Sequence, residues 1–118
     1  MKKHNYKKLT IWLRAKELVK VVYLISEKFP DSERFGITSQ MRRAIVSVVL
    51  NIVEGSGRNS SKDFAHFLNM AYTSLLEVEC LMTLSIDLNF LKEVDTTEVQ
   101  NEIEELLKMI YAFRDNLK

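Results

Sequence analysis

Residues 36–58 read GITSQMRRAIVSVVLNIVEGSGR, and neither proline nor glycine interrupts the run between Gly36 and Gly55. The apolar side chains in it recur at helical spacing and occupy two faces instead of one. One face holds Met41, Ala44, Ile45, Val48 and Ile52, and the other holds Val46, Val49, Leu50 and Val53. A helix of a small bundle needs a single apolar stripe to join the core. The second face therefore predicts a covering subunit, and we expect a homo-oligomer.

The remaining side of this helix is a narrow polar stripe. Its members are spaced 4, 4 and 3 residues apart, which aligns them on one side; they are Arg43, Ser47, Asn51 and Glu54. Thr38 or Ser39 can cap the start of the helix, and Gly55 and Gly57 can end it. These signals predict a helix over residues 39–54.

Three more segments carry helical patterns. Residues 10–29, with Thr10 as N-cap, repeat apolar side chains in alternating steps of 4 and 3. Residues 61–90 follow the capping pair Ser60 and Asp63, and residues 96–117 follow the capping signature Asp95-Thr-Thr-Glu98. Short connections between four helices favour antiparallel neighbours. We predict one all-α domain over residues 1–118, an elongated, antiparallel up-down-up-down four-helix bundle.

The composition excludes several other classes. The 118 residues include three Gly, one Pro and one Cys, and 47% of them are apolar and 28% charged. A β-sandwich would need a turn signal roughly every 8–12 residues. Collagen-like, disulfide-stapled and disordered chains have different compositions. Because the chain has so few helix-breaking residues, the all-α class is the one that remains.

The net charge of +1 hides an asymmetry along the chain. Residues 1–62 hold 13 Lys and Arg against 5 Asp and Glu, and residues 63–118 hold 4 against 11, which gives +8 and −7. A basic segment can bind nucleic acid. Equally, the two halves can neutralise each other across helix interfaces. The sequence leaves both interpretations open.

Two features bear on location. The single cysteine, Cys80, falls within a helical apolar pattern, so we expect a small core side chain without a disulfide or metal site. The first residues are basic but carry no apolar signal segment, and no apolar run approaches the roughly 20 residues of a membrane span. We expect a cytoplasmic protein with no membrane partner.

The run from Gly36 to Arg58 resembles the signature of the 23S rRNA-intervening sequence proteins. That family reads G-L-T-S-Q-(I/M)-R-R-A-x-V-S-I-P-x-N-I-A-E-G-x-G-R, preceded by a Trp and a Phe-Pro and followed by a Ser/Lys-rich step into F-x-x-F-L. The corresponding positions here are Trp12, Phe29-Pro30, Ser60-Ser61-Lys62 and Phe64-Ala-His-Phe67-Leu68. The resemblance spans nearly the whole chain.

Two positions depart from that pattern. Val49 stands where the family usually has proline, so the helix keeps a hydrogen bond and can run without a kink. Thr73 stands where a glycine often lets helices approach closely, so we expect looser packing there.

The resemblance implies a four-helix bundle that assembles into a homopentamer. The family is similar to the accessory variability determinant of diversity-generating retroelements, a pentameric basic barrel that binds nucleic acid and a reverse transcriptase. By this analogy the partners are further copies of the chain, RNA or DNA, and a reverse transcriptase or another protein.

Two sets of residues are candidates for function. Cations near the start of the chain and around residue 60 are candidate contacts to nucleic-acid phosphates, because a ring would multiply them into a band. They are Lys7, Lys8, Arg14, Lys16, Lys20, Arg58 and Lys62. The polar part of the family motif is a candidate seam between subunits, where buried polar groups can specify register. It comprises Arg42, Arg43, Ser47, Asn51, Glu54 and Gly55.

Each set has an alternative interpretation. The cations can be an ordinary solvated lysine face, and the motif residues can instead line a ligand or nucleic-acid surface. The main alternative to an RNA-binding scaffold is a purely structural or protein-interaction module whose basic half docks on the acidic half of its neighbour.

The sequence lacks catalytic patterns. No Glu-x-x-His motif of a di-iron bundle occurs, and Asp63-x-x-His66 occurs once. HEPN-type ribonucleases place a His closer behind an Arg than the seven residues that separate Arg58 from His66. We predict no enzyme, no metal and no cofactor, with a HEPN-like ribonuclease as a remote alternative.

Overall fold

Four long helices make up most of the chain in this computed structural model, which describes residues 4–117. They are α1 (Thr10–Ser26), α2 (Ile37–Ser56), α3 (Ser61–Asp87) and α4 (Thr97–Asp115). Three single 3-10 turns, η1 (Tyr6–Lys8), η2 (Asp31–Glu33) and η3 (Glu93–Asp95), precede α1, α2 and α4. All regular structure in the described range is helical, as the composition predicts.

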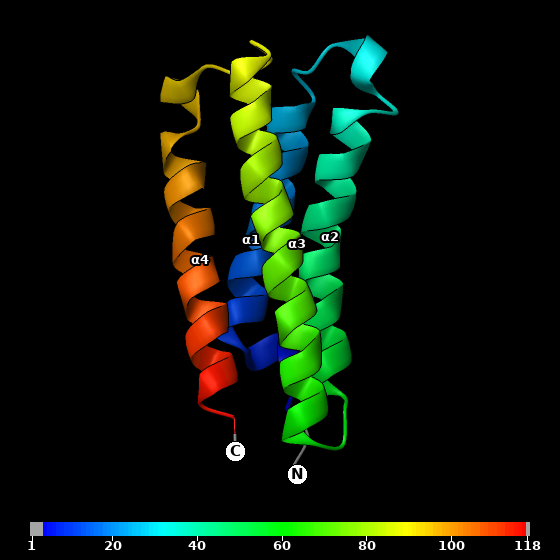
Figure 1. Cartoon of the computed structure of the whole chain (residues 1–118), viewed down its shortest axis with the longest axis vertical. Coiled ribbons are helices and arrows are strands. Elements are labelled where there is room, and N and C mark those ends of the chain that lie inside the picture. The colour runs from blue at the N-terminus through cyan, green and yellow to red at the C-terminus, as the bar shows by residue number, and fades with distance from the viewer. Residues whose placement is uncertain (1–3, 118) are drawn as a thin grey trace.

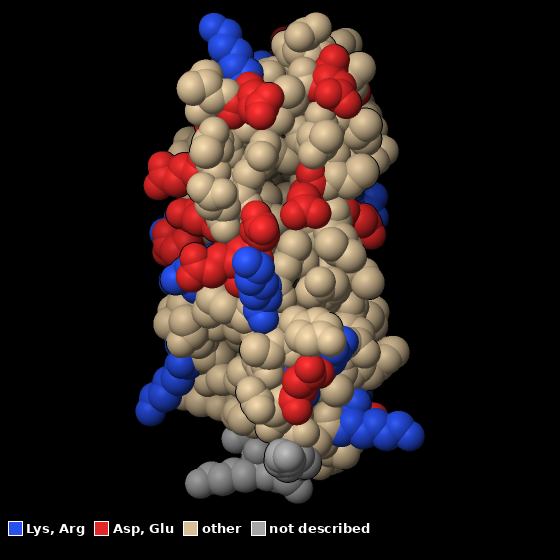
Figure 2. Space-filling model, turned by 60° about the vertical axis from the view of Figure 1, so that its left-hand side comes forward, with Lys and Arg blue, Asp and Glu red and all other residues tan. Residues whose placement is uncertain are grey.

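The helices form an elongated bundle. The chain runs up α1, down α2, up α3 and down α4 in the view of Figure 1, so consecutive helices are antiparallel. Around the bundle, α1 packs against α2 and α4, and α3 packs against α2 and α4. The extents are 47 × 25 × 19 Å (Figure 1 and Figure 2). We call the end with the α2–α3 connection the lower end, and the end with the other two connections the upper end.

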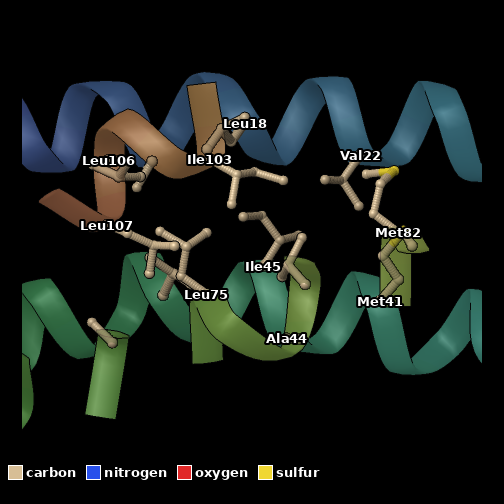
Figure 3. Packing of buried hydrophobic residues seen from close by; sticks show 14 of the residues in the cluster. Leu18, Val22, Met41, Ala44, Ile45, Leu75, Met82, Ile103, Leu106 and Leu107 are labelled. Atoms are coloured by element: carbon tan, nitrogen blue, oxygen red, sulfur yellow. The ribbon is translucent and has the colours of Figure 1, made fainter. Parts of the chain in front are cut away.

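The core follows the apolar stripes read from the sequence. In α4, Val99, Ile103, Leu106 and Ile110 are all buried, and their steps of 4, 3 and 4 keep them on one face. Side chains from all four helices meet in the interior, among them Leu18 and Val22 of α1 and Met82 of α3 (Figure 3). Phe64 is 0% exposed. The buried stripes of the four helices therefore form one shared core.

Helix ends differ from the predicted ones. Helix α1 ends at Ser26 instead of residue 29, and its N-cap is Leu9, with Thr10 as the first helical residue. Helix α2 starts at Ile37 after Gly36, because the Glu33 carboxylate accepts a hydrogen bond from the Ile37 N–H and replaces a Thr38 or Ser39 cap. Helix α3 ends at Asp87, short of residue 90.

The two remaining capping predictions have opposite outcomes. Ser60 Oγ accepts a hydrogen bond from the Asp63 N–H at 3.1 Å, so the predicted cap of α3 is confirmed. Helix α4 instead follows Thr96, whose hydroxyl donates to the Glu93 carbonyl and accepts from Gln100 Nε2, so Asp95 is not the cap.

Predictions about three individual residues need correction. Gly55 does not end α2; it is buried inside the helix, which continues to Ser56. Cys80 is exposed, not part of the core. Thr73 is also exposed and donates to the Met70 carbonyl, so its side chain does not separate two helices.

Candidate nucleic-acid interface

The lower end of the bundle gathers cations from three separate segments. Lys7 and Lys8 belong to η1, which lies beside α1 and α2, and Lys62 opens α3. The segment that carries η1 and the α2–α3 connection meet at this end in Figure 1. All three lysines are exposed, and none makes an ion pair within residues 4–117. We name Lys7, Lys8, Arg58 and Lys62 the basic end.

An aromatic contact holds the N-terminal segment on the bundle. The His4 ring lies 5.1 Å from the Phe64 ring and 5.8 Å from the Phe113 ring, both in edge-to-face geometry. Phe64 lies in turn against Gly55, where an added Cβ would come within 2.7 Å of the Phe64 ring. The segment that carries the η1 lysines is therefore anchored on a tightly packed part of the core around Phe64.

The three cations of α1 are more strongly engaged with their own chain. Arg14 pairs with Glu105 of α4 at 2.7 Å, and Lys20 pairs with Glu17 at 3.5 Å. Lys16 Nζ lies 5.3 Å from the centre of the Trp12 ring, a cation–π contact. Of the seven cations predicted to bind phosphate, these three lie apart from the basic end.

Arg58 combines a charge with an aromatic surface. It pairs with Glu54 at 3.2 Å, and its guanidinium lies 4.5 Å from the centre of the Phe67 ring. In the sequence, Phe67 stood out only as a position of the family pattern. The available signal was the Ser60 cap, because a helix that begins at Ser61 has Phe67 in its second turn, where Arg58 of the preceding connection contacts it.

Ion pairing leaves the charge asymmetry of the sequence in place. Five ion pairs occur within residues 4–117, and only Arg14–Glu105 joins the basic half to the acidic half. On the face drawn in Figure 2, most acidic side chains lie in the upper and middle parts, and the lower part carries more Lys and Arg. This face thus carries charge of opposite sign in different parts.

The motif residues of α2 divide into those bonded within the chain and those facing out. Arg42 donates to Ser26 Oγ at 2.8 Å and to the Tyr23 carbonyl at 3.3 Å, so it ties α2 to the end of α1. Ser47 Oγ lies 3.0 Å from Ser74 Oγ of α3, and Asn51 Nδ2 donates to both the carbonyl and the hydroxyl of Ser47. The Arg42 and Ser47 contacts hold α2 to α1 and α3, whereas the Asn51 bonds stay within α2.

Arg43 is the motif cation that faces outward. It is exposed, makes no ion pair within the described residues, and lines a polar hollow between α2 and α3 with Ser47, Ser74 and Glu77. The second apolar face of α2 is partly open as well: Leu50 is 56% exposed, and it lines a separate hollow with Tyr23 and Val46.

The residues considered for catalysis are not assembled into a recognisable site. His66 is exposed and its ring lies 5.4 Å from Phe67, the ring that Arg58 also covers. Across residues 4–117, no three His, Cys, Asp or Glu side chains come together as a metal site would require. None of the described helices has the length and apolar character needed to cross a bilayer.

Comparisons with known proteins place the chain by sequence and by fold. Among curated proteins, none matches it. A solved structure from Bacteroides thetaiotaomicron, described as a protein with unknown function from the S23 ribosomal protein family, superposes with a TM-score of 0.82 at 20% identity; the match covers 89% of this chain and 98% of that chain. The family described as 23S rRNA-intervening sequence protein matches residues 7–112. The chain therefore belongs to the 23S rRNA-intervening sequence protein family.

Proposed function

We propose that this chain is a non-enzymatic cytoplasmic protein that assembles into a homo-oligomer, most simply a pentamer, and binds RNA through its basic end. One observation carries the RNA-binding part. Lys7 and Lys8 of η1 and Lys62 at the start of α3 belong to two segments of the lower end, and none of them has a carboxylate partner in the described chain. Cations that are free of intramolecular pairs can neutralise phosphates without first breaking a bond.

Aromatic rings beside the cations favour a nucleic acid over a simple anion. Phe67 lies under Arg58, and Tyr6, which precedes Lys7 and Lys8 in η1, lies against Trp12. Single-stranded RNA is commonly bound by cations along the backbone together with rings on which bases stack. We therefore expect a preference for RNA with unpaired segments.

Assembly is supported by the surface of α2 and by the sequence resemblance. Leu50 is more than half exposed on an apolar face that a four-helix core does not need. The resemblance to the pentameric accessory variability determinant suggests five subunits. In a ring, each basic end would be repeated around the axis, and the salt dependence of binding would steepen with the number of phosphates contacted.

The RNA-binding proposal is tested by fluorescence anisotropy with a labelled RNA stem-loop between 50 and 200 mM salt. The triple variant Lys7→Gln, Lys8→Gln, Lys62→Gln should bind more weakly and lose about 0.7–0.9 of slope in log K against log salt for each phosphate contact removed. A matched triple, Lys28→Gln, Lys92→Gln, Lys108→Gln, makes the same change in net charge away from the basic end and should bind like the wild type.

Three outcomes would contradict the RNA-binding proposal: no binding at 50 mM salt, a flat salt response, or equal losses in the two triple variants. Assembly is measured separately by light scattering. A pentamer has a mass of about 69 kDa, five times the 13.8 kDa of the chain. A mass of 13.8 kDa at micromolar concentration would refute the oligomer.

The second candidate is an interaction module that binds no nucleic acid. The ion pairs of Arg14, Lys20 and Arg58 favour it, because these cations already have carboxylate partners. It predicts a stable oligomer that fails to shift the anisotropy of any RNA, a result that the same two measurements would reveal.

A further inference from the structure

We infer that the subunits contact one another head to tail, with Phe35 of one copy seated in a hollow between α1 and α4 of the next. This contact rests on the proposed homo-oligomer and assigns residues to it. Phe35 belongs to the turn that joins η2 to α2, at the upper end. It is 91% exposed, the highest fraction among the large apolar side chains of residues 4–117.

The Phe35 side chain is exposed from a well-bonded turn. The Glu33 N–H donates to the Pro30 carbonyl, the Arg34 N–H to the Asp31 carbonyl, and the Gly36 N–H to the Glu33 carbonyl. At Gly36, a Cβ would come within 2.6 Å of Glu33 Oε1, so a side chain there would displace the carboxylate that accepts from the Ile37 N–H. A ring presented by a fixed backbone loses little conformational entropy when a partner covers it.

A hollow on the opposite side of the bundle has a suitable size and lining. It has a volume of about 310 Å³, and its apolar floor comes from Val21, Leu24, Ile25 and Val99. A cavity of about 150 Å³ is sufficient to hold a benzene ring. Leu24 is 64% exposed at this site, so the hollow is itself an uncovered apolar surface.

Charge complementarity argues that the occupant is a second copy of this chain. Asp95, Glu98 and Glu102 line the hollow, and none of them makes an ion pair within residues 4–117. Next to Phe35, the Arg34 guanidinium lies 5.7 Å from the ring centre and also lacks an ion pair in that range. The arginine would meet the acidic rim as the ring enters the hollow.

The two acidic residues of the same turn, Asp31 and Glu33, form no ion pair with Arg34 within residues 4–117. The Glu33 carboxylate accepts from the first amide of α2, where the helix dipole favours a negative charge. Asp31 lines a small hollow together with Arg34 and Arg42, but it forms no ion pair with either arginine within residues 4–117. Arg43, exposed on the same side of the bundle as Phe35, adds a second unpaired cation to this surface.

The two surfaces lie on opposite sides of the upper end of the bundle. Phe35 lines the hollow between α2 and α3, whereas the acidic hollow lies between α1 and α4. Both are at the upper end, near the connections seen in Figure 1. Copies placed side by side with parallel axes can therefore repeat the same contact. A contact of this heterologous kind forms a ring when the rotation between subunits closes.

The contact is tested with two variants that each damage one side of it. Phe35→Ala removes the inserted ring, and Leu24→Glu places a carboxylate in the hollow; both positions are exposed, so the fold should persist by circular dichroism. Each variant alone should dissociate, with the dissociation constant raised about 30-fold or more, as expected for a central anchor residue. Leu88→Ala, an exposed position outside both surfaces, should keep the wild-type mass.

Mixing the two variants gives the sharpest readout. One intact contact can form between them, so native mass spectrometry should find a 1:1 heterodimer of about 27.6 kDa, twice 13.8 kDa, and nothing larger. Exchanging the charges supplies a second test. Arg34→Glu and Glu98→Arg should each weaken assembly, and the two together in one chain should restore it.

The outcomes of these tests distinguish a failure of the Phe35 contact from a failure of the proposed oligomer. A monomeric wild type would refute the oligomer and the contact together. An oligomeric wild type whose mass is unchanged by Phe35→Ala and by Leu24→Glu, or a mixture without a heterodimer, would refute the contact alone. RNA binding is measured at the other end of the bundle and is not used in either decision.

Discussion

Replacing Gly55 with alanine should destabilise the fold although alanine is the better helix former. The added Cβ would lie 2.7 Å from Phe64 Cδ1 and 3.0 Å from Phe67 Cβ, whereas ordinary contacts begin near 3.4 Å. The Phe64 ring would have to retreat by about 0.7 Å, the difference between 3.4 and 2.7 Å. It has no room to do so, since it is fully buried and packed against His4 and Phe113.

The expected magnitude follows from two opposing terms. Alanine gains about 1 kcal/mol over glycine inside a helix. Overpacking a core costs about 1–3 kcal/mol, and the fixed position of Phe64 places this site near the upper value. The net loss in the free energy of unfolding should be about 2 kcal/mol. For a chain of this length, that corresponds to a melting temperature lower by about 8 °C.

Gly57 provides the matched control. An added Cβ there would meet only two carbonyl oxygens, at 3.7 and 3.9 Å, and its φ of −90° suits any residue. Gly57→Ala should therefore be neutral or stabilising by up to about 1 kcal/mol. Urea unfolding at one fixed protein concentration measures both variants, because assembly makes stability depend on concentration.

A double-mutant cycle identifies the steric cause. In a Phe64→Leu background the ring that blocks the Cβ is gone, so Gly55→Ala should cost less by more than about 0.5 kcal/mol. If Gly55→Ala unfolds at the same urea concentration as Gly57→Ala, or costs as much without the ring, the reasoning from close packing is wrong.

Three further predictions concern the capping bond of Ser60, the bond between Ser47 and Ser74, and the exposure of Cys80. Ser60→Ala should lower the free energy of unfolding by about 1 kcal/mol, because it removes the cap of α3; an unchanged urea midpoint would contradict that role. Ser47→Ala should cost about 1 kcal/mol by leaving Ser74 unpaired, and Ser47→Ala with Ser74→Ala should recover part of the loss; a larger loss in the double variant would argue against the bond. Cys80 should react with a thiol reagent in the folded chain at a rate close to that in urea, whereas strong protection would return it to the core.

Helix identity was predictable because periodicity determines which side chains are buried. The stripe of α1 holds Ile11, Ala15, Leu18 and Val22, all of which are buried. Cys80 shows where the same reasoning needs more care. It lies two residues from Val78 and two from Met82, both buried, and a step of two residues points to the far side of a helix. A residue flanked by apolar residues in the sequence is therefore not necessarily buried.

Helix ends were less predictable because several groups compete for the same free amides. Thr10 has the side chain of a cap, yet Leu9 holds the cap position. Gly55 has the conformational freedom to end a helix, yet the helix continues through it, because the absent side chain is needed for contact with Phe64 and Phe67. In both cases tertiary packing outweighs a local preference.

Pairing of charges could not be read from the sequence. The totals of +8 and −7 are properties of composition, but whether they cancel depends on which side chains meet. Arg14 and Glu105 come from opposite ends of the chain, and only the antiparallel packing of α1 and α4 brings them together. Phe35 was missed for a related reason, since an aromatic residue in a polar linker has no periodicity that would indicate its exposure.

The two proposals use different parts of one bundle, and this separation makes the charge asymmetry intelligible. The unpaired lysines at the lower end lie far from the acidic hollow at the upper end, because the helices between them run most of the 47 Å length. Phosphate bound at the lower end would not compete with Asp95, Glu98 and Glu102 for Arg34. A chain whose halves cancelled internally would have neither surface available. With one ion pair between the halves, residues 4–117 keep enough uncompensated charge of both signs for each surface to attract its own partner.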